Sequence, residues 1–276
     1  MSEFDQTDYP KKIRSWAGEP FASFVRDLNR AVDFYYLTVG GLRMIAETSP
    51  RLDELNAKRM RLSEQCRQLA PPEIRHLWED EDKEKENSEA EEPIREASRL
   101  AKVEVDEGFP TLHRQVTLSL WSSLEWLISN LLANLVANEP KILSIEGIRK
   151  VKVSIAELEN LSGMEKYYYL LSEIERDAKS GLRQGVDRFE STLQVFGLSG
   201  SVPETIKKDL FEFGHVRNVL VHRNGVADAR FVQACPWLGL SAGQAVIVDE
   251  ARLSQYIHVV LEYVKLLGDR LVSHLA

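Results

Sequence analysis

Residues 112–137, LHRQVTLSLWSSLEWLISNLLANLVA, contain the longest apolar stretch of the chain, which runs from Val116 to Ala137. One face carries leucines at helical spacing, with three large apolar residues beside them: Leu120, Leu124, Leu127, Leu131 and Leu135, then Trp121, Ile128 and Leu132. A helix with so wide an apolar surface is buried on most sides. The segment also contains Glu125, four serines and two asparagines, which argue against a membrane span. It therefore predicts the central helix of an all-α bundle.

The sequence before this segment predicts a helical hairpin at the N-terminus. Apolar residues recur at helical spacing from Phe21 to Leu42, and Ser49-Pro50 interrupts the pattern. A second helix is expected from Leu52 to Leu69, and the sequence Ala70-Pro71-Pro72 ends it. The two helices together predict a helix–turn–helix pair.

An acidic run, EDEDKEKENSEAEE, occupies residues 79–92 and holds nine acids and two lysines. It accounts for most of the chain's net charge of −8, so the remainder is nearly neutral and nucleic acid is not excluded as a partner. Such runs are usually solvated, as linkers or exposed helix ends, although one can also mimic nucleic acid or dock a basic partner. The predicted organisation is a helical segment at 1–78, an acidic linker at 79–107 and a helical domain at 108–276.

The remaining apolar periodicity predicts four more helices after the central one. They cover 164–179, 182–196 and 201–222, and a closing amphipathic helix begins after Asp249.

Two local signals describe the ends of these helices. Ser201 and Glu204 have the spacing of a capping box, and Asn224-Gly225 is expected to end the helix that they begin. Residues 229–248 lack helical periodicity, and QAVIV at 244–248 predicts a short strand. The predicted fold class is thus an all-α bundle with a short irregular or β insertion before the last helix.

Cysteines and short motifs exclude several classes of protein. Cys66 and Cys235 are not in a CxxC pair, so neither a disulfide framework nor a cysteine zinc site is expected, and free thiols fit a reducing cytoplasm. The polar N-terminus does not resemble a signal peptide. Glycine-rich nucleotide loops, HExxH and GxSxG are absent from the sequence, and we expect no cofactor and no metal.

The most informative chemistry lies late in the segment 201–222. Ile206, Leu210, Phe213 and Leu220 form one apolar stripe, and Arg217 falls on the same stripe. An arginine that points toward a core needs a partner, or it costs several kcal/mol, roughly. A second face carries His215, Asn218 and His222, and the last two are one helical turn apart.

The sequence Arg217-Asn218-Val219-Leu220-Val221-His222 resembles the defining motif of the HEPN family, which is an arginine, four to six residues and a histidine. A polar residue often follows the arginine in that family, as Asn218 does here. The order of a long early helix with Glu125, a motif helix, a loop and a closing helix is also similar. The resemblance covers about 108–276 and implies a HEPN-like helical bundle.

The resemblance also implies an activity, which is metal-independent RNA cleavage by an endoribonuclease. In such family members two motif helices meet across a homodimer and share one cleft. His222 would act as acid and base, Arg217 would hold the phosphate, and Asn218 would orient the imidazole. His215 and Glu125 are possible auxiliaries, and Glu125 is expected to be structural rather than catalytic.

The expected biological role, a cytoplasmic toxin or antiviral (phage) defence protein, comes from the resemblance alone. It implies an RNA substrate, a homodimer, an antitoxin or a defence-system partner protein, and no membrane. The alternative is an inactive HEPN-like module that dimerises and recruits a partner, and a plain helical scaffold stays open as well. In these alternatives Arg217 pairs with Glu125 to brace the bundle, and His222 favours the dipole at its helix end.

Overall fold

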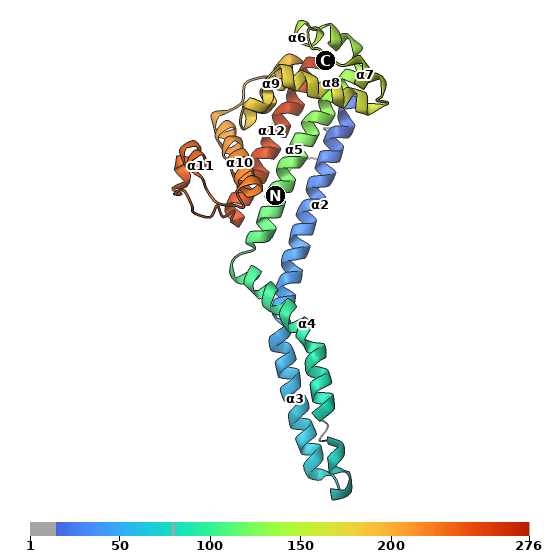
Figure 1. The fold of residues 1–276 in the computed structure, drawn as a ribbon, viewed down its shortest axis with the longest axis vertical. Coiled ribbons are helices and arrows are strands. Elements are labelled where there is room, and N and C mark those ends of the chain that lie inside the picture. The colour runs from blue at the N-terminus through green and yellow to red at the C-terminus, as the bar shows by residue number, and fades with distance from the viewer. Residues whose placement is uncertain (1–14, 79–80, 276) are drawn as a thin grey trace. The chain divides into compact units, whose positions relative to one another are not determined.

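The computed structural model describes residues 15–78 and 81–275, and every regular element among them is helical (Figure 1). The predicted all-α class is therefore confirmed. Contacts within the chain divide it into two compact units. The bundle unit comprises Met1–Val32 and His113–Ala276, and the hairpin unit comprises Asp33–Leu112. Among the described residues, no helix is long and apolar enough to cross a membrane.

The hairpin unit contains the end of α2 (Ser15–Ala46), then α3 (Thr48–Leu69), a 3-10 helix at Pro72–Trp78, and α4 (Glu81–Asp106). The break between α2 and α3 lies at Glu47, slightly before the predicted position at Ser49-Pro50. Pro50 instead occupies the first turn of α3, where its missing N–H is not needed for a helical hydrogen bond. The predicted second helix, 52–69, and its end at Ala70 are confirmed.

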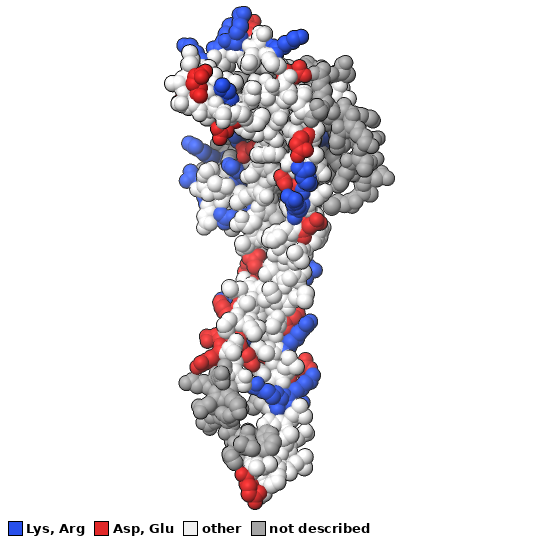
Figure 2. Space-filling view, turned by 90° about the vertical axis from the view of Figure 1, so that its right-hand side faces the viewer, with Lys and Arg blue, Asp and Glu red and all other residues white. Residues whose placement is uncertain are grey.

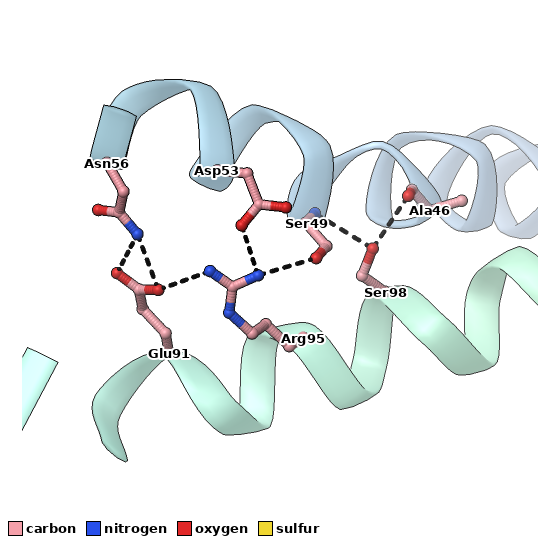
Figure 3. Close-up of polar contacts among 7 residues, drawn as sticks. All are labelled: Ala46, Ser49, Asp53, Asn56, Glu91, Arg95 and Ser98. Atoms are coloured by element: carbon pink, nitrogen blue, oxygen red, sulfur yellow. Dashed lines mark hydrogen bonds and ion pairs between the residues drawn. The ribbon is translucent and has the colours of Figure 1, made fainter. Parts of the chain in front are cut away.

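The antiparallel partner of α3 is α4, and not the helix that precedes it as the sequence predicted. Arg95 of α4 lies 2.6 Å from an Asp53 carboxylate oxygen and 3.0 Å from one of Glu91 (Figure 3). Asn56 donates to Glu91 at 2.8 Å, and the Ser98 hydroxyl donates to the Ala46 carbonyl at 2.9 Å. Residues 81–106, placed in an acidic linker from the sequence, are thus one side of a helical hairpin whose seam is largely polar.

The bundle unit is built on α5 (Pro110–Asn138), the predicted central helix. Leu124, Leu127 and Leu131 are completely buried, which confirms the apolar face predicted for residues 112–137. The first part of α2, up to Val32, also belongs to this unit. Its other long helices are α8 (Met164–Asp177), α9 (Val186–Val195), α10 (Glu204–His222) and α12 (Glu250–Leu275). Short helices α6 (Glu146–Arg149) and α7 (Ile155–Glu159) follow α5.

The start of α9 differs from the sequence prediction. The predicted helix began at residue 182, but Gly185 has a positive φ of 57° and α9 begins after it. A Cβ at Gly185 would lie 2.7 Å from the Phe211 Cα, so only glycine fits where this loop crosses α10.

The predicted capping box at the start of α10 is wrong. The N-cap residue is Pro203, and it provides no side-chain cap. The Ser201 carbonyl accepts a hydrogen bond from Arg270 at 3.0 Å, so this segment is held by α12. The cap by Asp249 is confirmed, since its carboxylate accepts from the Arg252 amide at 2.8 Å.

The insertion between α10 and α12 is irregular, as predicted, but the strand at 244–248 does not form. Its backbone makes one isolated antiparallel bridge, between Val226 and Ala245. The rest of the insertion contains α11 (Ala229–Ala234) and a 3-10 turn at Pro236–Leu238. Val246 donates to the Gly225 carbonyl at 2.7 Å, which ties the insertion to the turn that ends α10.

Two carboxylates hold α12 against the rest of the bundle unit. Glu190 of α9 accepts hydrogen bonds from the Tyr263 hydroxyl at 2.8 Å and from Arg270 at 2.7 Å. Glu212 of α10 accepts from the buried Tyr256 hydroxyl at 3.0 Å. Burial beside Glu190 raises the pKa of Tyr263 well above its usual value, so the hydroxyl remains a donor.

Candidate functional site

The candidate site lies on α10, and the helix separates its members by burial. Ile206, Leu210, Phe213, Val216 and Leu220 form the buried face of the helix. Arg217 lies at the edge of this face with 24% of its side chain exposed, while Asn218 and His222 face solvent. The sequence placed Arg217 on the apolar stripe, but Val216 takes the buried position. Arg217 is therefore accessible to both the bundle and a ligand.

The Arg217 guanidinium has two partners within the bundle unit. Its Nη2 lies 3.8 Å from a Glu125 carboxylate oxygen, and its Nη1 donates to the Asn218 side-chain oxygen at 3.2 Å. Glu125 has a closer partner, because Arg188 of α9 donates to it at 2.5 Å. One carboxylate of α5 is thus shared by two arginines. The ion pair between Arg217 and Glu125 is the contact on which the structural alternative depends.

His222 occupies the last turn of α10 and is exposed. It makes no hydrogen bond or ion pair with any residue that the structure describes. The turn after it is fixed, since the amides of Arg223 and Gly225 both donate to the Val219 carbonyl, at 2.9 and 3.1 Å. Asn224 and Gly225 both have positive φ, which confirms the predicted end of the helix. The imidazole therefore lies at a helix end fixed by backbone hydrogen bonds, and no residue in the described part of the chain bonds to its ring.

The structure brings Arg217, Asn218 and Glu125 together but does not join His222 to them by a direct contact. Asn218 is one turn before His222, yet its side-chain oxygen accepts from Arg217. In this arrangement Asn218 does not contact the His222 imidazole, which it would orient according to the resemblance. The orienting role remains a prediction for the ligand-bound protein.

Arg114 also lies at this site, although the sequence alone did not identify it. Its Nη2 donates to the Leu220 carbonyl at 2.5 Å, and its Nη1 donates to the Asn224 side chain at 3.2 Å. A cation beside the last carbonyls of a helix is favourable because of the helix dipole. Arg223, paired with Asp228 at 3.4 Å, adds another exposed cation at the same helix end. Arg114 is about a hundred residues from α10 in sequence, so only the fold reveals its place.

The contacts of His215 are those of a packing residue. Its Nε2 lies 2.6 Å from the Gln184 side-chain oxygen, and its ring lies 4.4 Å from that of Phe211. Because an amide oxygen only accepts, the imidazole donates in this contact. Burial lowers the pKa of His215, with Asp228 acting in the opposite direction. The ring is therefore a neutral packing group near pH 7.

A cleft of about 240 Å³ lies next to Glu125, between α5, α8 and α9. Glu125, Glu175, Arg176 and Arg188 supply its charged groups, and Ser129, Ser172 and Ser180 supply hydroxyls. Burial raises the pKa of the Glu175 carboxyl, while Arg188 acts to lower it. Among the described residues, no group of His, Cys, Asp and Glu side chains has the arrangement of a metal site.

In comparisons with known proteins, no family model matches the chain, and neither a curated protein nor a solved structure gives a significant match.

Proposed function

We propose that this protein is a metal-independent endoribonuclease of the HEPN type, with its site at the end of α10. The observation that carries the proposal is the exposed His222, which no described residue engages, on the same helix as a half-buried Arg217. Arg114, His222 and Arg223 lie at the end of α10, and Arg217 lies five residues earlier on the same helix. Such a group suits a phosphodiester, because arginines bind phosphate oxygens and a histidine transfers protons near neutral pH.

In the proposed reaction the ribose 2′-hydroxyl is the nucleophile. A neutral His222 accepts the proton of this hydroxyl as O2′ bonds to phosphorus. The bond from phosphorus to the 5′-oxygen breaks, and a protonated imidazole supplies the proton that this oxygen takes up. In a homodimer the two roles fall to the two His222 side chains of one composite site. The products are a 2′,3′-cyclic phosphate and a 5′-hydroxyl.

Arg217 is suited to stabilise the charge on the phosphorane oxygens. Its contact with Glu125 is long, at 3.8 Å, and Arg188 holds the same carboxylate more closely, at 2.5 Å. When Arg217 turns to a phosphate, Glu125 keeps a counter-charge, so the cost of releasing Arg217 is small.

The second candidate function is an inactive HEPN-like module that dimerises and recruits a partner protein. One observation favours it, which is that Arg217 is already engaged by Glu125 and Asn218. The proposed role as a toxin or phage-defence ribonuclease, with an antitoxin or defence-system partner, rests on the family resemblance.

The test compares purified full-length wild type with His222→Ala on labelled RNA in excess EDTA. His258→Ala is the matched control, because His258 is an exposed histidine on α12 that pairs with Glu262. We expect wild type and His258→Ala to cleave and His222→Ala to lose at least 100-fold in rate. Equal cleavage by all three would contradict the role of His222, and no cleavage by any would favour the recruiting module.

A further inference from the structure

The cleft between α5, α8 and α9 combines apolar and charged lining. Ile128 and Phe189, both buried, supply apolar surface, while Glu175 and Arg176, neighbours on α8, supply charged groups. Its volume of about 240 Å³ lies just below the range of about 300–1,000 Å³ that holds drug-sized ligands. A small planar molecule with several polar atoms, such as a nucleobase, suits a cleft of this size and lining.

The Glu175 carboxyl lines this cleft without a hydrogen bond or a close ion pair to any residue that the structure describes. Arg188 and Glu125 act on it only electrostatically, and Arg188 makes its close contact, at 2.5 Å, with Glu125. Because Glu175 is partly buried, its carboxyl loses hydration without gaining donors, and burial raises its pKa. A ligand that donates hydrogen bonds to Glu175 would replace the water that burial removes.

Arg176 supplies hydrogen-bond donors beside this carboxyl. Its Nη2 binds the Glu173 carboxylate on the same helix, and 74% of its side chain is exposed. A guanidinium carries five N–H donors, so this one contact leaves most of them available to a ligand. Glu175 and Arg176 therefore offer two acceptor oxygens and a set of donors from adjacent positions of α8.

Guanine has the complementary pattern of polar atoms. Its N1–H and N2–H groups are adjacent donors that one carboxylate accepts together, and its O6 and N7 are adjacent acceptors that an arginine binds bidentately. Adenine, cytosine and uracil each place an acceptor beside their donor, and that acceptor would face the Glu175 carboxylate. A neutral base also suits the charge of the cleft, because Arg176 and Arg188 balance the two glutamates of its lining.

Glu125 connects the cleft to the proposed catalytic site within the bundle unit. It lines the cleft and lies 3.8 Å from Arg217, which is proposed to hold the phosphate. Base and phosphate of one nucleotide are joined through a single ribose, so a base in the cleft brings its phosphate toward Arg217. Single-stranded RNA is recognised in this manner, through unstacked bases that are hydrogen-bonded on their edges.

The charged surface of the bundle unit does not by itself select an RNA sequence. On the face that Figure 2 shows, basic and acidic side chains are interspersed over this unit. Contacts to phosphates position a nucleic acid but carry no sequence information, whereas contacts to base edges specify the sequence. Hydrogen bonds inside the cleft are therefore the contacts that distinguish one nucleotide from another.

We propose that the cleft between α5, α8 and α9 binds guanine, with the Glu175 carboxylate accepting from N1 and N2 and Arg176 donating to O6 and N7. Its use in selecting the nucleotide beside the cleaved bond rests on the proposed ribonuclease function, whereas guanine binding itself does not.

The first experiment measures the binding of mononucleotides to the full-length protein by isothermal titration calorimetry. The probes 5′-GMP, 5′-IMP and 5′-AMP share one ribose phosphate, so differences between them report the base. We expect 5′-GMP to bind at least about tenfold more tightly than 5′-AMP, and 5′-IMP, which lacks the N2 amino group, to lie between them. Equal affinities for the three nucleotides, or no binding of 5′-GMP, overturn the proposal.

Glu175→Gln tests the carboxylate, because it replaces one acceptor oxygen by an amide donor that faces the donors of guanine. We expect the preference for 5′-GMP over 5′-AMP to fall to less than about twofold. Glu165→Gln is the matched control, since Glu165 is an exposed glutamate of α8 outside the cleft lining, and it should keep the preference. Far-UV circular dichroism checks that both variants are folded. A Glu175→Gln protein with the full preference overturns the role of Glu175.

The second experiment separates the guanine site from the ribonuclease function. Cleavage sites are mapped in an RNA of mixed sequence and in the same RNA with inosine in place of guanosine. We expect cuts beside guanosines, reduced at least about fivefold by inosine and by Glu175→Gln. Cleavage that is indifferent to the base overturns the selecting role and leaves the ribonuclease in place. Selective binding of 5′-GMP without any RNA cleavage supports the guanine site and contradicts the ribonuclease function.

Discussion

Arg188 of α9 donates a hydrogen bond to the Glu125 carboxylate of α5 at 2.5 Å, and this contact joins two helices of the bundle unit. Arg217 reaches the same carboxylate at the longer distance of 3.8 Å. The two arginines therefore share one partner but lie at unequal distances from it, so the proposed catalytic role of Arg217 can be tested separately from the structural role of Arg188.

Substitution of each arginine by alanine separates these roles. Arg188→Ala removes the closer partner of Glu125, and we expect it to lower the free energy of unfolding by about 1–3 kcal/mol. Arg217→Ala is expected to lower it by less than about 1 kcal/mol, yet to reduce RNA cleavage by about 100-fold or more. Thermal unfolding and single-turnover cleavage of both variants check this. If Arg217→Ala destabilises the protein most and Arg188→Ala reduces cleavage most, the assignment is reversed.

Glu175 gives a prediction with a defined dependence on pH. Burial raises the pKa of its carboxyl in the folded protein, so the folded state binds the proton more tightly than the unfolded state. The stability that this group contributes is present below its unfolded pKa and is lost as pH rises through the folded pKa. We expect Glu175→Gln to be more stable than wild type at pH 7.

Denaturant unfolding of wild type and Glu175→Gln at pH 7 and pH 4 tests this expectation. The advantage of the variant should shrink at the lower pH, where the wild-type carboxyl is protonated. A variant that is less stable at pH 7 would mean that Arg188 stabilises the charged carboxylate more than burial disfavours it.

For His215 we expect the opposite dependence of protein stability on pH. Burial lowers its pKa in the folded state, so the unfolded chain binds the proton more tightly and stability falls as pH decreases below the unfolded value. We expect His215→Gln, which keeps a polar group near Gln184, to lose less stability between pH 7 and pH 5.5 than wild type does. Equal losses in the two proteins would show that His215 does not contribute.

Glu190 is expected to be the strongest anchor of α12. It accepts from Tyr263, Arg270 and the Gly200 amide, and Arg270 has only 16% of its side chain exposed. Glu190→Ala leaves that cation without its partner and is expected to cost about 3–5 kcal/mol of stability. The exposed Glu262 of α12 serves as the control, and Glu262→Ala should cost less than about 0.5 kcal/mol. Similar losses for both variants would contradict the anchoring role.

Apolar periodicity predicted those helices that bury one face. The stretch 112–137 became α5, and the closing helix after Asp249 became α12, because leucine spacing and a side-chain cap are local signals. The partner of α3 was not predicted, since the described contacts with α4 are one ion pair and several hydrogen bonds, and a charge-rich sequence does not show which polar groups will pair. The residues QAVIV at 244–248 have the composition of a β-strand, but their backbone makes only one isolated β-bridge with a described residue.

The candidate site was predictable in part for the same reason. Arg217, Asn218 and His222 lie on one helix, so their spacing was visible in the sequence, and the contact of Arg217 with Glu125 was one of the interpretations left open. The Arg188–Glu125 and Arg114–Leu220 contacts join helices far apart in the chain, and residue spacing holds no information about them.

The chemistry of the RNA ends is the most direct test of the proposed activity. The full-length protein is incubated in excess EDTA with an end-labelled RNA and with the same sequence carrying 2′-O-methyl groups throughout. We expect cleavage of the first substrate only, giving 2′,3′-cyclic phosphate and 5′-hydroxyl ends that His222→Ala does not produce. Cleavage of the methylated substrate, or products with 5′-phosphate ends, would contradict attack by the 2′-hydroxyl and with it the role assigned to His222.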